Sequence, residues 1–271
     1  MKPLFKVLSA RASATTPLIS AMQRGCRCNG TAPSSSSLSF AMSGCGWLWP
    51  FYLGVIKKMK SLSHLTNDSL CAGTSGGSLG AMVACLNIEP ELALDLIIHM
   101  SKQESFKSDI DKGLKESLKS ILPDNAVEQC NGKLHVVTTK LWPNPTLKPT
   151  IISSFKSNDE LIDTVAASCF IPFYSSLRLT TRIKGHDGLY ADGGILAFMP
   201  LIGDVKVSPF NRVWIKPLGA NPDICLPIED YPLTQLLVWS LKPAEPKILN
   251  ELFLKGQVEA EKYCLDRVRA N

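Results

Sequence analysis

One serine of this chain stands among residues with little or no side chain. Residues 70–77 read LCAGTSGG, and Gly73, Gly76 and Gly77 surround Ser75. The segment matches the pattern G-x-S-x-G, in which a sharp turn between a strand and a helix exposes a nucleophilic serine hydroxyl. A chain of this size meets that pattern by chance about once in ten at average residue frequencies. The motif therefore needs support from its surroundings, and the alternative is that Ser75 simply caps a helix.

A serine hydroxyl needs a neighbouring base before it attacks well, and the usual base is histidine. The first three of the four histidines stand in stretches typical of packing or surface positions; they are His64, His99 and His135. The fourth, His186, lies in the glycine-rich loop KGHDGLYADGG. Asp187, directly beside it, is the only evident acidic residue that would orient its ring.

The same loop offers a second base. Asp192 follows a short apolar run and precedes Gly193 and Gly194, so it can end a strand and meet Ser75 directly. A carboxyl group with the ordinary pKa of about 3.9 is a weak base. Burial would raise that pKa and bring it nearer the working pH. The alternative is an ordinary Asp-Gly turn.

A glycine-rich loop precedes both motifs. Residues 43–47 read SGCGW, so the loop of Gly44, Cys45 and Gly46 presents backbone N–H groups that can hold a carbonyl oxygen as it gains charge. Such a loop can also cradle a phosphate. A dinucleotide site is disfavoured, because Trp49 stands where the third glycine of G-x-G-x-x-G belongs and no acidic residue follows at the expected distance.

The surrounding sequence predicts the elements that would position these residues. Strand patterns and helix patterns alternate, which favours an α/β fold with a mainly parallel sheet covered by helices. Strands are expected at 38–42, 69–73, 133–139, 150–153, 205–208 and 212–216. Helices are expected from Pro50 to about residue 59, at 76–86, after a capping box of Ser157 and Glu160, and over the last 45 residues except near 242–246.

Residues 91–129 have an amphipathic helical pattern. Apolar side chains recur at helical spacing between charged residues, at Leu114, Leu118, Ile121 and Leu122. Two interpretations stay open: the apolar face packs on the core, or the segment around 101–130 forms a lid over an apolar cleft.

The first 36 residues differ from the rest of the chain. No Asp or Glu precedes Asp68, and the opening stretch is basic and rich in Ser, Thr and Ala. Residues 1–36 therefore resemble a transit peptide for a plastid or mitochondrion, or form a tail without an address. In the second case the cytosol, a lipid-droplet surface or a membrane surface is expected. Residues 37–271 are predicted to form a single domain.

The composition is that of an ordinary globular protein, with 45% hydrophobic and 20% charged residues among 271 and a formal net charge of +5. Glycines and a proline interrupt the most apolar stretch, 38–56, so no membrane-spanning helix is expected. Nine scattered cysteines do not suggest a disulfide framework. Cys26 and Cys28 lack the second pair that a metal site needs. No metal, cofactor or nucleic-acid partner is expected.

Taken in order, the three motifs resemble those of the patatin-like phospholipase family. They are Gly44-Cys45-Gly46, then Gly73-Thr74-Ser75-Gly76-Gly77, then Asp192-Gly193-Gly194. Finer features are similar to the adiponutrin and adipose triglyceride lipase branch, namely SGCGWLWPFYLGV (43–55), SFKSNDELIDTVAASCFIPFY (154–174) and VSPF (207–210). The resemblance implies a three-layer α/β/α fold and a Ser–Asp dyad that uses no histidine, metal or organic cofactor.

By that resemblance Ser75 is the nucleophile, Asp192 is the base, and the N–H groups around Gly44, Cys45 and Gly46 form the oxyanion hole. The implied function is a serine lipid acyl hydrolase that cleaves glycerolipid esters, of triacylglycerol or phospholipid, at a membrane or lipid-droplet surface. An acyltransferase that uses the same acyl-enzyme and a non-catalytic lipid-surface binding protein are the alternatives. The branch favours a neutral glycerolipid.

Two residues depart from the family pattern, and one cluster is left open. Trp49 replaces the third loop glycine, where it can reshape the end of the loop or contact acyl chains. Phe198 stands where a polar residue often follows the D-G-G segment, which makes the wall beside Asp192 more apolar. A basic cluster just before Asp192 either meets anionic headgroups or is a solvated loop; it comprises Arg178, Arg182 and Lys184.

Overall fold

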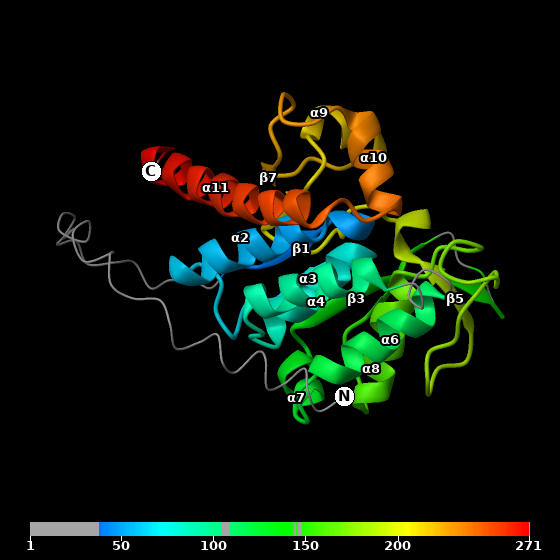
Figure 1. The fold of residues 1–271 in the computed structure, drawn as a ribbon. Coiled ribbons are helices and arrows are strands. Elements are labelled where there is room, and N and C mark those ends of the chain that lie inside the picture. Colours follow the sequence, from blue (N-terminus) through cyan, green and yellow to red (C-terminus); the bar gives the residue numbers. More distant parts are fainter. Residues whose placement is uncertain (1–37, 104–108, 144, 146–147, 271) are drawn as a thin grey trace. The chain divides into compact units, whose positions relative to one another are not determined.

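A computed structural model describes residues 38–103, 109–143, 145 and 148–270, which belong to one compact unit (Figure 1). The leader expected at residues 1–36 lies outside the described residues, and so do Cys26 and Cys28. None of the described helices is both long enough and apolar enough to cross a membrane.

The centre of the unit is a mostly parallel sheet, with seven strands among the described residues. The strands are β1 (Phe40–Met42), β2 (Cys71–Thr74), β3 (Leu134–Trp142), β4 (Thr150–Ile152), β5 (Leu189–Asp192), β6 (Val205–Ser208) and β7 (Ile224–Cys225). Their order is β4-β3-β2-β1-β6-β7, with β5 pairing with β3 off this path. Pairings are parallel except those of β4 and β5 with β3. Every residue of β1 and β2 is buried, as expected for parallel strands within a core.

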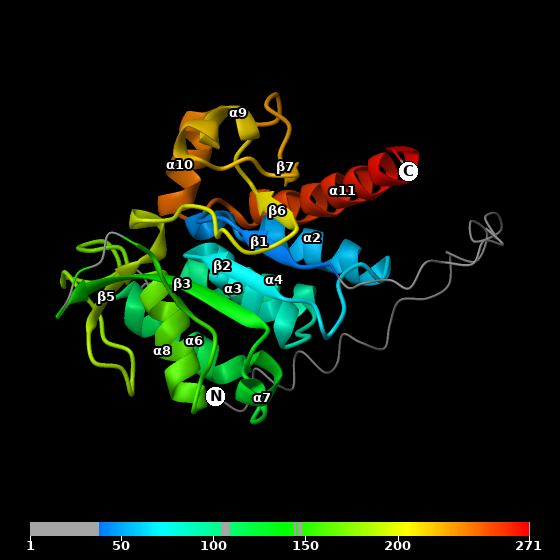
Figure 2. The same cartoon turned by 180° about the vertical axis from the view of Figure 1, so that it is seen from behind.

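Helices flank the sheet (Figures 1 and 2). They are α2 (Pro50–Ser61), α3 (Gly76–Cys85), α4 (Pro90–Lys102), α6 (Ile110–Ile121), α7 (Ala126–Cys130), α8 (Asn158–Ser168), α9 (Arg212–Ile215), α10 (Leu233–Leu241) and α11 (Pro246–Ala270). Three short 3₁₀ turns complete them: η1 (Gly46–Leu48), η2 (Gly193–Ile195) and η3 (Lys216–Leu218). The prediction of an α/β fold with a mainly parallel sheet is confirmed.

Several local predictions are confirmed in detail. Pro50 opens α2, and the Ser157 hydroxyl accepts the Glu160 N–H at 3.2 Å to cap α8. The partner carboxylate departs from a strict capping box, because Glu160 Oε2 accepts from the Lys156 N–H at 2.9 Å. The C-terminal segment forms α10 and α11, with the expected break between them.

One strand prediction is wrong. Residues 212–216, expected as a strand, begin with helix α9 (Arg212–Ile215). The Asn211 side chain accepts the Val213 N–H at 3.1 Å, which satisfies a backbone donor at the helix start. β6 pairs with β1 on one side and with β7 on the other, and β7 is a two-residue strand that the sequence pattern did not reveal.

The amphipathic stretch 91–129 divides into α4, α6 and α7, with residues 104–108 outside the described part. Leu114 and Leu118 of α6 are buried against the core. Of the two interpretations, the packed helix is the arrangement present in this structure.

Candidate active site

Ser75 occupies the turn between β2 and α3, at φ +53° and ψ −130°, a backbone region that residues other than glycine rarely adopt. Hydrogen bonds on both sides hold the turn. The Ser75 N–H donates to Ser168 Oγ at 2.9 Å, and Ser168 Oγ in turn donates to the Val137 carbonyl at 2.7 Å. The Ser75 carbonyl accepts from the N–H and the hydroxyl of Ser78 at 2.7 and 2.6 Å. The predicted strand–turn–helix around the serine is therefore present.

The glycines of the motif are required by close backbone contacts. A Cβ atom on Gly73 would lie 2.3 Å from the Gly77 carbonyl oxygen, and one on Gly77 would lie 2.3 Å from that of Met42. A Cβ on Gly76 would lie 2.5 Å from the Gly46 oxygen. The turn is thus packed directly against β1 and against the loop that follows β1, which leaves no room for a side chain.

Asp192 ends β5, and its carboxylate is buried. Its Oδ1 accepts the Gly194 N–H at 2.7 Å, while Oδ2 has no hydrogen-bond partner among the described residues. Burial raises the pKa of Asp192 to about 6, against the opposing effects of the Ser75 hydroxyl and the Gly194 N–H. The serine hydroxyl thus lies near enough to act on the carboxylate, although no hydrogen bond of ordinary geometry joins them. The structure brings together the two residues predicted from separate motifs.

The backbone around Asp192 is fixed by its neighbours. The Asp192 N–H donates to the Phe170 carbonyl at 2.7 Å, and its carbonyl accepts from the Thr139 hydroxyl at 2.8 Å. A Cβ on Gly193 would lie 2.2 Å from the Val137 carbonyl oxygen, so this glycine is the residue that lets the turn after β5 approach β3. The carboxylate is therefore held in place by contacts to β3 and to the segment after α8.

Two buried thiols lie near the carboxylate. Burial raises the pKa of both Cys45 and Cys169, and the negative charge of Asp192 raises both further. The thiols therefore stay protonated and neutral at physiological pH. They leave Asp192 in surroundings of low polarity, which favour its protonated form and so strengthen it as a base.

The glycine loop lies against the serine turn. A Cβ on Gly44 would lie 3.7 Å from Ser75 Cβ, but the Gly44 N–H itself donates to the Phe198 carbonyl at 2.8 Å. The N–H groups of Cys45, Gly46 and Gly76 donate to no acceptor among the described residues. Of the three residues predicted for the oxyanion hole, Gly44 has its donor engaged, and Cys45 and Gly46 have theirs unused.

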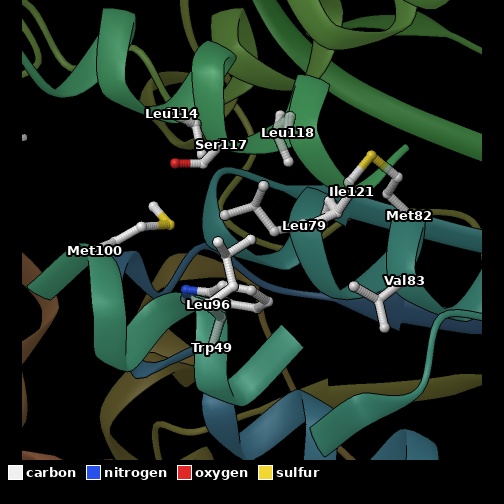
Figure 3. A pocket seen from close by; sticks show the side chains of 10 residues that line it. All are labelled: Trp49, Leu79, Met82, Val83, Leu96, Met100, Leu114, Ser117, Leu118 and Ile121. Carbon is white, nitrogen blue, oxygen red and sulfur yellow. The ribbon is translucent and has the colours of Figure 1, made fainter. Parts of the chain in front are cut away.

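Of the two departures from the family pattern, Phe198 borders the glycine loop, and Trp49 lies at an apolar gap among the helices. Phe198 packs beside Gly44, where a Cβ on the glycine would lie 3.5 Å from its ring. Trp49 lies at a gap of about 10 Å³ that is bounded by α3, α4 and α6 (Figure 3). The lining is apolar apart from Ser117, and the gap has room for about one water molecule.

The other sequence candidates are placed elsewhere or are paired. His186 Nε2 lies 2.7 Å from Glu160 Oε1, an acidic partner from α8 that the sequence did not indicate. Arg178 pairs with Asp111 at 2.6 Å, and Lys184 pairs with Asp159 at 2.6 Å. Arg182 lines an open hollow of about 480 Å³ together with Lys115 and Arg178.

Ser168 is the residue of the site that sequence reasoning missed. It is the last residue of α8, and it joins the strained turn at Ser75 to β3. The available signal was a serine that closes the otherwise small and apolar run TVAAS, where a polar group is buried only if it has a partner.

The comparisons with known proteins agree with this geometry. A family model described as "Patatin-like phospholipase" matches residues 40–203. Human 1-acylglycerol-3-phosphate O-acyltransferase PNPLA3 is 26% identical over 85% of this chain and 51% of its own length. Mouse patatin-like phospholipase domain-containing protein 2 is 27% identical over 83% of this chain and 49% of its own. Human patatin-like phospholipase domain-containing protein 4 is 32% identical over 67% and 74%.

These relatives confirm the resemblance to the adiponutrin and adipose triglyceride lipase branch. The chain spans about half the length of the first two. The family match covers the glycine loop, the serine turn and the segment that ends at Asp192, which are the parts that meet in the structure. The chain belongs to the patatin-like phospholipase family.

Proposed function

We propose that this chain is a serine lipid acyl hydrolase that cleaves carboxylic esters of glycerolipids. One observation carries the proposal: the strained Ser75 turn holds its hydroxyl beside a buried carboxylate, Asp192, whose pKa is raised to about 6. A nucleophile and a base of suitable strength thus lie near each other without a histidine. Family membership and the names of the relatives, which include an acyltransferase and a phospholipase domain-containing protein, support a reaction on lipid acyl groups.

In this mechanism Asp192 accepts the Ser75 proton as Oγ attacks the ester carbonyl. The carbonyl oxygen gains a negative charge, which the unused N–H groups of Cys45, Gly46 and Gly76 stabilise. Protonated Asp192 then gives its proton to the departing alcohol, and an acyl group remains on Ser75. A water molecule, deprotonated by Asp192, attacks this ester; the fatty acid leaves, and the proton returns to Ser75.

Gly44 has a different role in this proposal from the one its motif suggested. Its N–H donates to the Phe198 carbonyl and gives no hydrogen bond to the oxyanion. Its lack of a side chain instead lets the loop lie close to Ser75. Gly76, at the start of α3, supplies a donor in its place, because the first N–H groups of a helix have no partner within the helix. The positive end of the α3 dipole adds to the stabilisation of the oxyanion.

An acyltransferase on the same dyad is the second candidate. The specific observation in its favour is the human relative named 1-acylglycerol-3-phosphate O-acyltransferase PNPLA3. The two reactions share every step up to the acyl-enzyme and differ only in whether water or a lipid alcohol removes the acyl group. A non-catalytic lipid-surface protein is disfavoured, because such a protein has no use for a strained serine beside a buried carboxylate.

The substrate proposed is a neutral glycerolipid or phospholipid met at a membrane or lipid-droplet surface, with the chain bound peripherally. Residues 37–271 would carry this activity, and residues 1–36 would determine whether the protein acts in an organelle or at surfaces reached from the cytosol.

The test compares four proteins on a mixed emulsion of triacylglycerol and phospholipid, with products resolved by lipid class. Wild type and Ser120→Ala, a change on the exposed face of α6, should release fatty acid equally. Ser75→Ala and Asp192→Asn should each lose activity by at least about a thousandfold while remaining folded. Adding a monoacylglycerol acceptor separates the two candidates, because transfer yields diacylglycerol in place of free acid. Full activity in either folded variant would refute the dyad.

A further inference from the structure

Large apolar side chains are exposed on the segment between α8 and β5. Leu177 is 94% exposed, Phe173 is 67% exposed and Leu179 is 59% exposed, all within seven residues. Three more apolar side chains, each about half exposed, lie on α10, at Leu237, Val238 and Leu241. Single exposed apolar residues are normal, whereas groups of them mark surfaces that meet something apolar. We call these six residues the rim.

The two parts of the rim are joined to each other and to the glycine loop. The Tyr174 hydroxyl accepts from Trp47 Nε1 at 3.2 Å and donates to the Leu241 carbonyl at the end of α10. A Cβ on Gly46 would lie 1.8 Å from the Ser240 carbonyl oxygen, so α10 rests directly on the loop. The rim therefore flanks the loop proposed to hold the oxyanion, with α10 drawn in orange in Figure 1.

Backbone conformation and hydrogen bonds keep the rim residues between α8 and β5 exposed. Phe173 has φ +61°, a strained value for an aromatic residue, and its N–H donates to the Arg178 carbonyl at 3.1 Å. Arg178 is itself fixed by Ser176 Oγ at 3.0 Å and by Asp111 of α6 at 2.6 Å. The segment is held by these contacts with its apolar side chains toward solvent, where they have a free-energy cost unless something covers them.

Charge and position indicate what covers the rim. Arg178, between Leu177 and Leu179, is paired with the buried Asp111. Arg182 lines the adjacent hollow with Arg178, is exposed, and has no ion-pair partner among the described residues. Apolar side chains with cations beside them match a lipid surface, in which acyl chains lie beneath charged headgroups. A protein bound here would cover the approach to a site whose proposed substrate is a lipid. A lipid surface instead delivers that substrate.

We propose that the rim inserts into the surface of a lipid aggregate and positions the active site over it. The role given to the rim rests on the proposed function. Its test does not, because vesicle binding is measurable without catalysis. The probe is vesicles of phosphatidylcholine with about a third phosphatidylserine. The protein is the full chain with Ser75→Ala, which prevents hydrolysis from altering the vesicles.

The decisive variant is Leu177→Asp, which places a charge on the most exposed rim residue without disturbing the core. Its matched control is Val268→Asp, because Val268 is 76% exposed near the C-terminal end of α11, far from β5 and its neighbouring loops (Figures 1 and 2). Leu177→Asp should lower the vesicle partition coefficient about tenfold or more, and Val268→Asp should leave it within about twofold. Val238→Asp on α10 should act like Leu177→Asp. In the chain with Ser75 intact, Leu177→Asp should keep hydrolysis of a short, water-soluble ester unchanged and lose hydrolysis of emulsified lipid.

Four outcomes would contradict the proposal that the rim inserts into lipid. They are no vesicle binding by the parent chain, unchanged binding by Leu177→Asp, equal losses in Leu177→Asp and Val268→Asp, and a dimer lost in Leu177→Asp without any change in vesicle binding. The last outcome would assign the rim to contact between two copies of the chain. If no variant, including the chain with Ser75 intact, releases fatty acid while Leu177→Asp still weakens vesicle binding, the proposed function fails and the rim stands.

Discussion

The floor and the rim of the candidate site differ in burial and in packing. The floor, made of Ser75, Asp192 and the glycines between them and the sheet, is buried, and backbone atoms approach one another too closely for any side chain to be added. The rim is exposed and joined to the body of the protein at a few points, such as Tyr174 and Arg178. Under the two proposals, a change in the floor should affect chemistry and stability together, whereas a change in the rim should affect how the site reaches lipid.

Both regions contain a residue with a left-handed backbone, and the surroundings of these residues differ. Ser75, at φ +53°, is held through its N–H and its carbonyl by three hydrogen bonds to Ser168 and Ser78. Phe173, at φ +61°, is held by one backbone hydrogen bond and faces solvent. Strain orients a side chain in each case, but only the floor constrains it from both sides.

The largest effect should come from a methyl group added to the floor. Gly77→Ala would place Cβ 2.3 Å from the Met42 carbonyl oxygen and 2.5 Å from that of Ser43. Neither oxygen can move without displacing β1, so the free energy of unfolding should fall by about 3 kcal/mol or more. Urea denaturation followed by far-UV circular dichroism measures the loss.

Gly132→Ala is the matched control for that change. Gly132 has φ +74° and nothing within 4 Å of the added methyl, so only backbone strain is introduced. A loss of about 1 kcal/mol is expected. Equal losses in the two variants would mean that the floor is no more tightly packed than an open turn, and the comparison between floor and rim would fail.

The second effect separates chemistry from stability within the floor. Asp192 carries a pKa of about 6 in the folded chain, against about 3.9 in an unfolded one, so the folded protein binds the extra proton between these values. The free energy of unfolding therefore falls as pH rises from about 4 to about 6, and the deficit remains above pH 6. Asp192→Asn removes the charge that causes this deficit.

Asp192→Asn should accordingly raise the free energy of unfolding at pH 7 by about 2 to 3 kcal/mol, while fatty-acid release is lost. The gain should shrink toward zero near pH 4, and denaturation curves at the two pH values measure it. Wild-type activity should rise with pH through about 6 as the base loses its proton. A variant that is less stable than wild type at pH 7 would show that Asp192 is stabilised by its charge, contrary to its burial.

The two catalytic candidates were predictable because each lies in a short motif with its own local physics. Glycines around Ser75 indicate a turn without room for side chains, and Asp192 before two glycines indicates a strand end. Their closeness was not predictable from spacing alone. It depends on β5 pairing antiparallel with β3, which places the end of β5 beside the end of β2.

The features that the sequence did not reveal all depend on partners distant in the chain. Ser168 looks like any small residue at the end of a helix until the Ser75 N–H is found on its hydroxyl. The Gly44 N–H looks available until Phe198 occupies it. Residues 212–216 have strand-like composition, and the cap from Asn211 decides for a helix instead. Local patterns specify turns and periodicity, whereas long-range contacts decide which polar groups remain free.

The smallest effect on stability should come from the rim, where lipid binding should fall without a loss of stability. Phe173→Gly removes the steric cost of φ +61° and removes an aromatic ring that is 67% exposed. The free energy of unfolding should rise by about 1 kcal/mol, or stay level where the greater freedom of glycine in the unfolded chain offsets the relief. Partitioning onto vesicles should fall severalfold, because the ring no longer enters the lipid.

Phe173→Asn distinguishes these two consequences, because asparagine tolerates the left-handed region but presents a polar side chain. It should match Phe173→Gly in vesicle binding and retain wild-type stability to within about 0.5 kcal/mol. A loss of stability in both variants would show that the ring packs on its own protein and that its exposure serves no contact with lipid. Preserved vesicle binding in both would remove Phe173 from the rim and leave Leu177 and Leu179 as the only members of that segment able to insert.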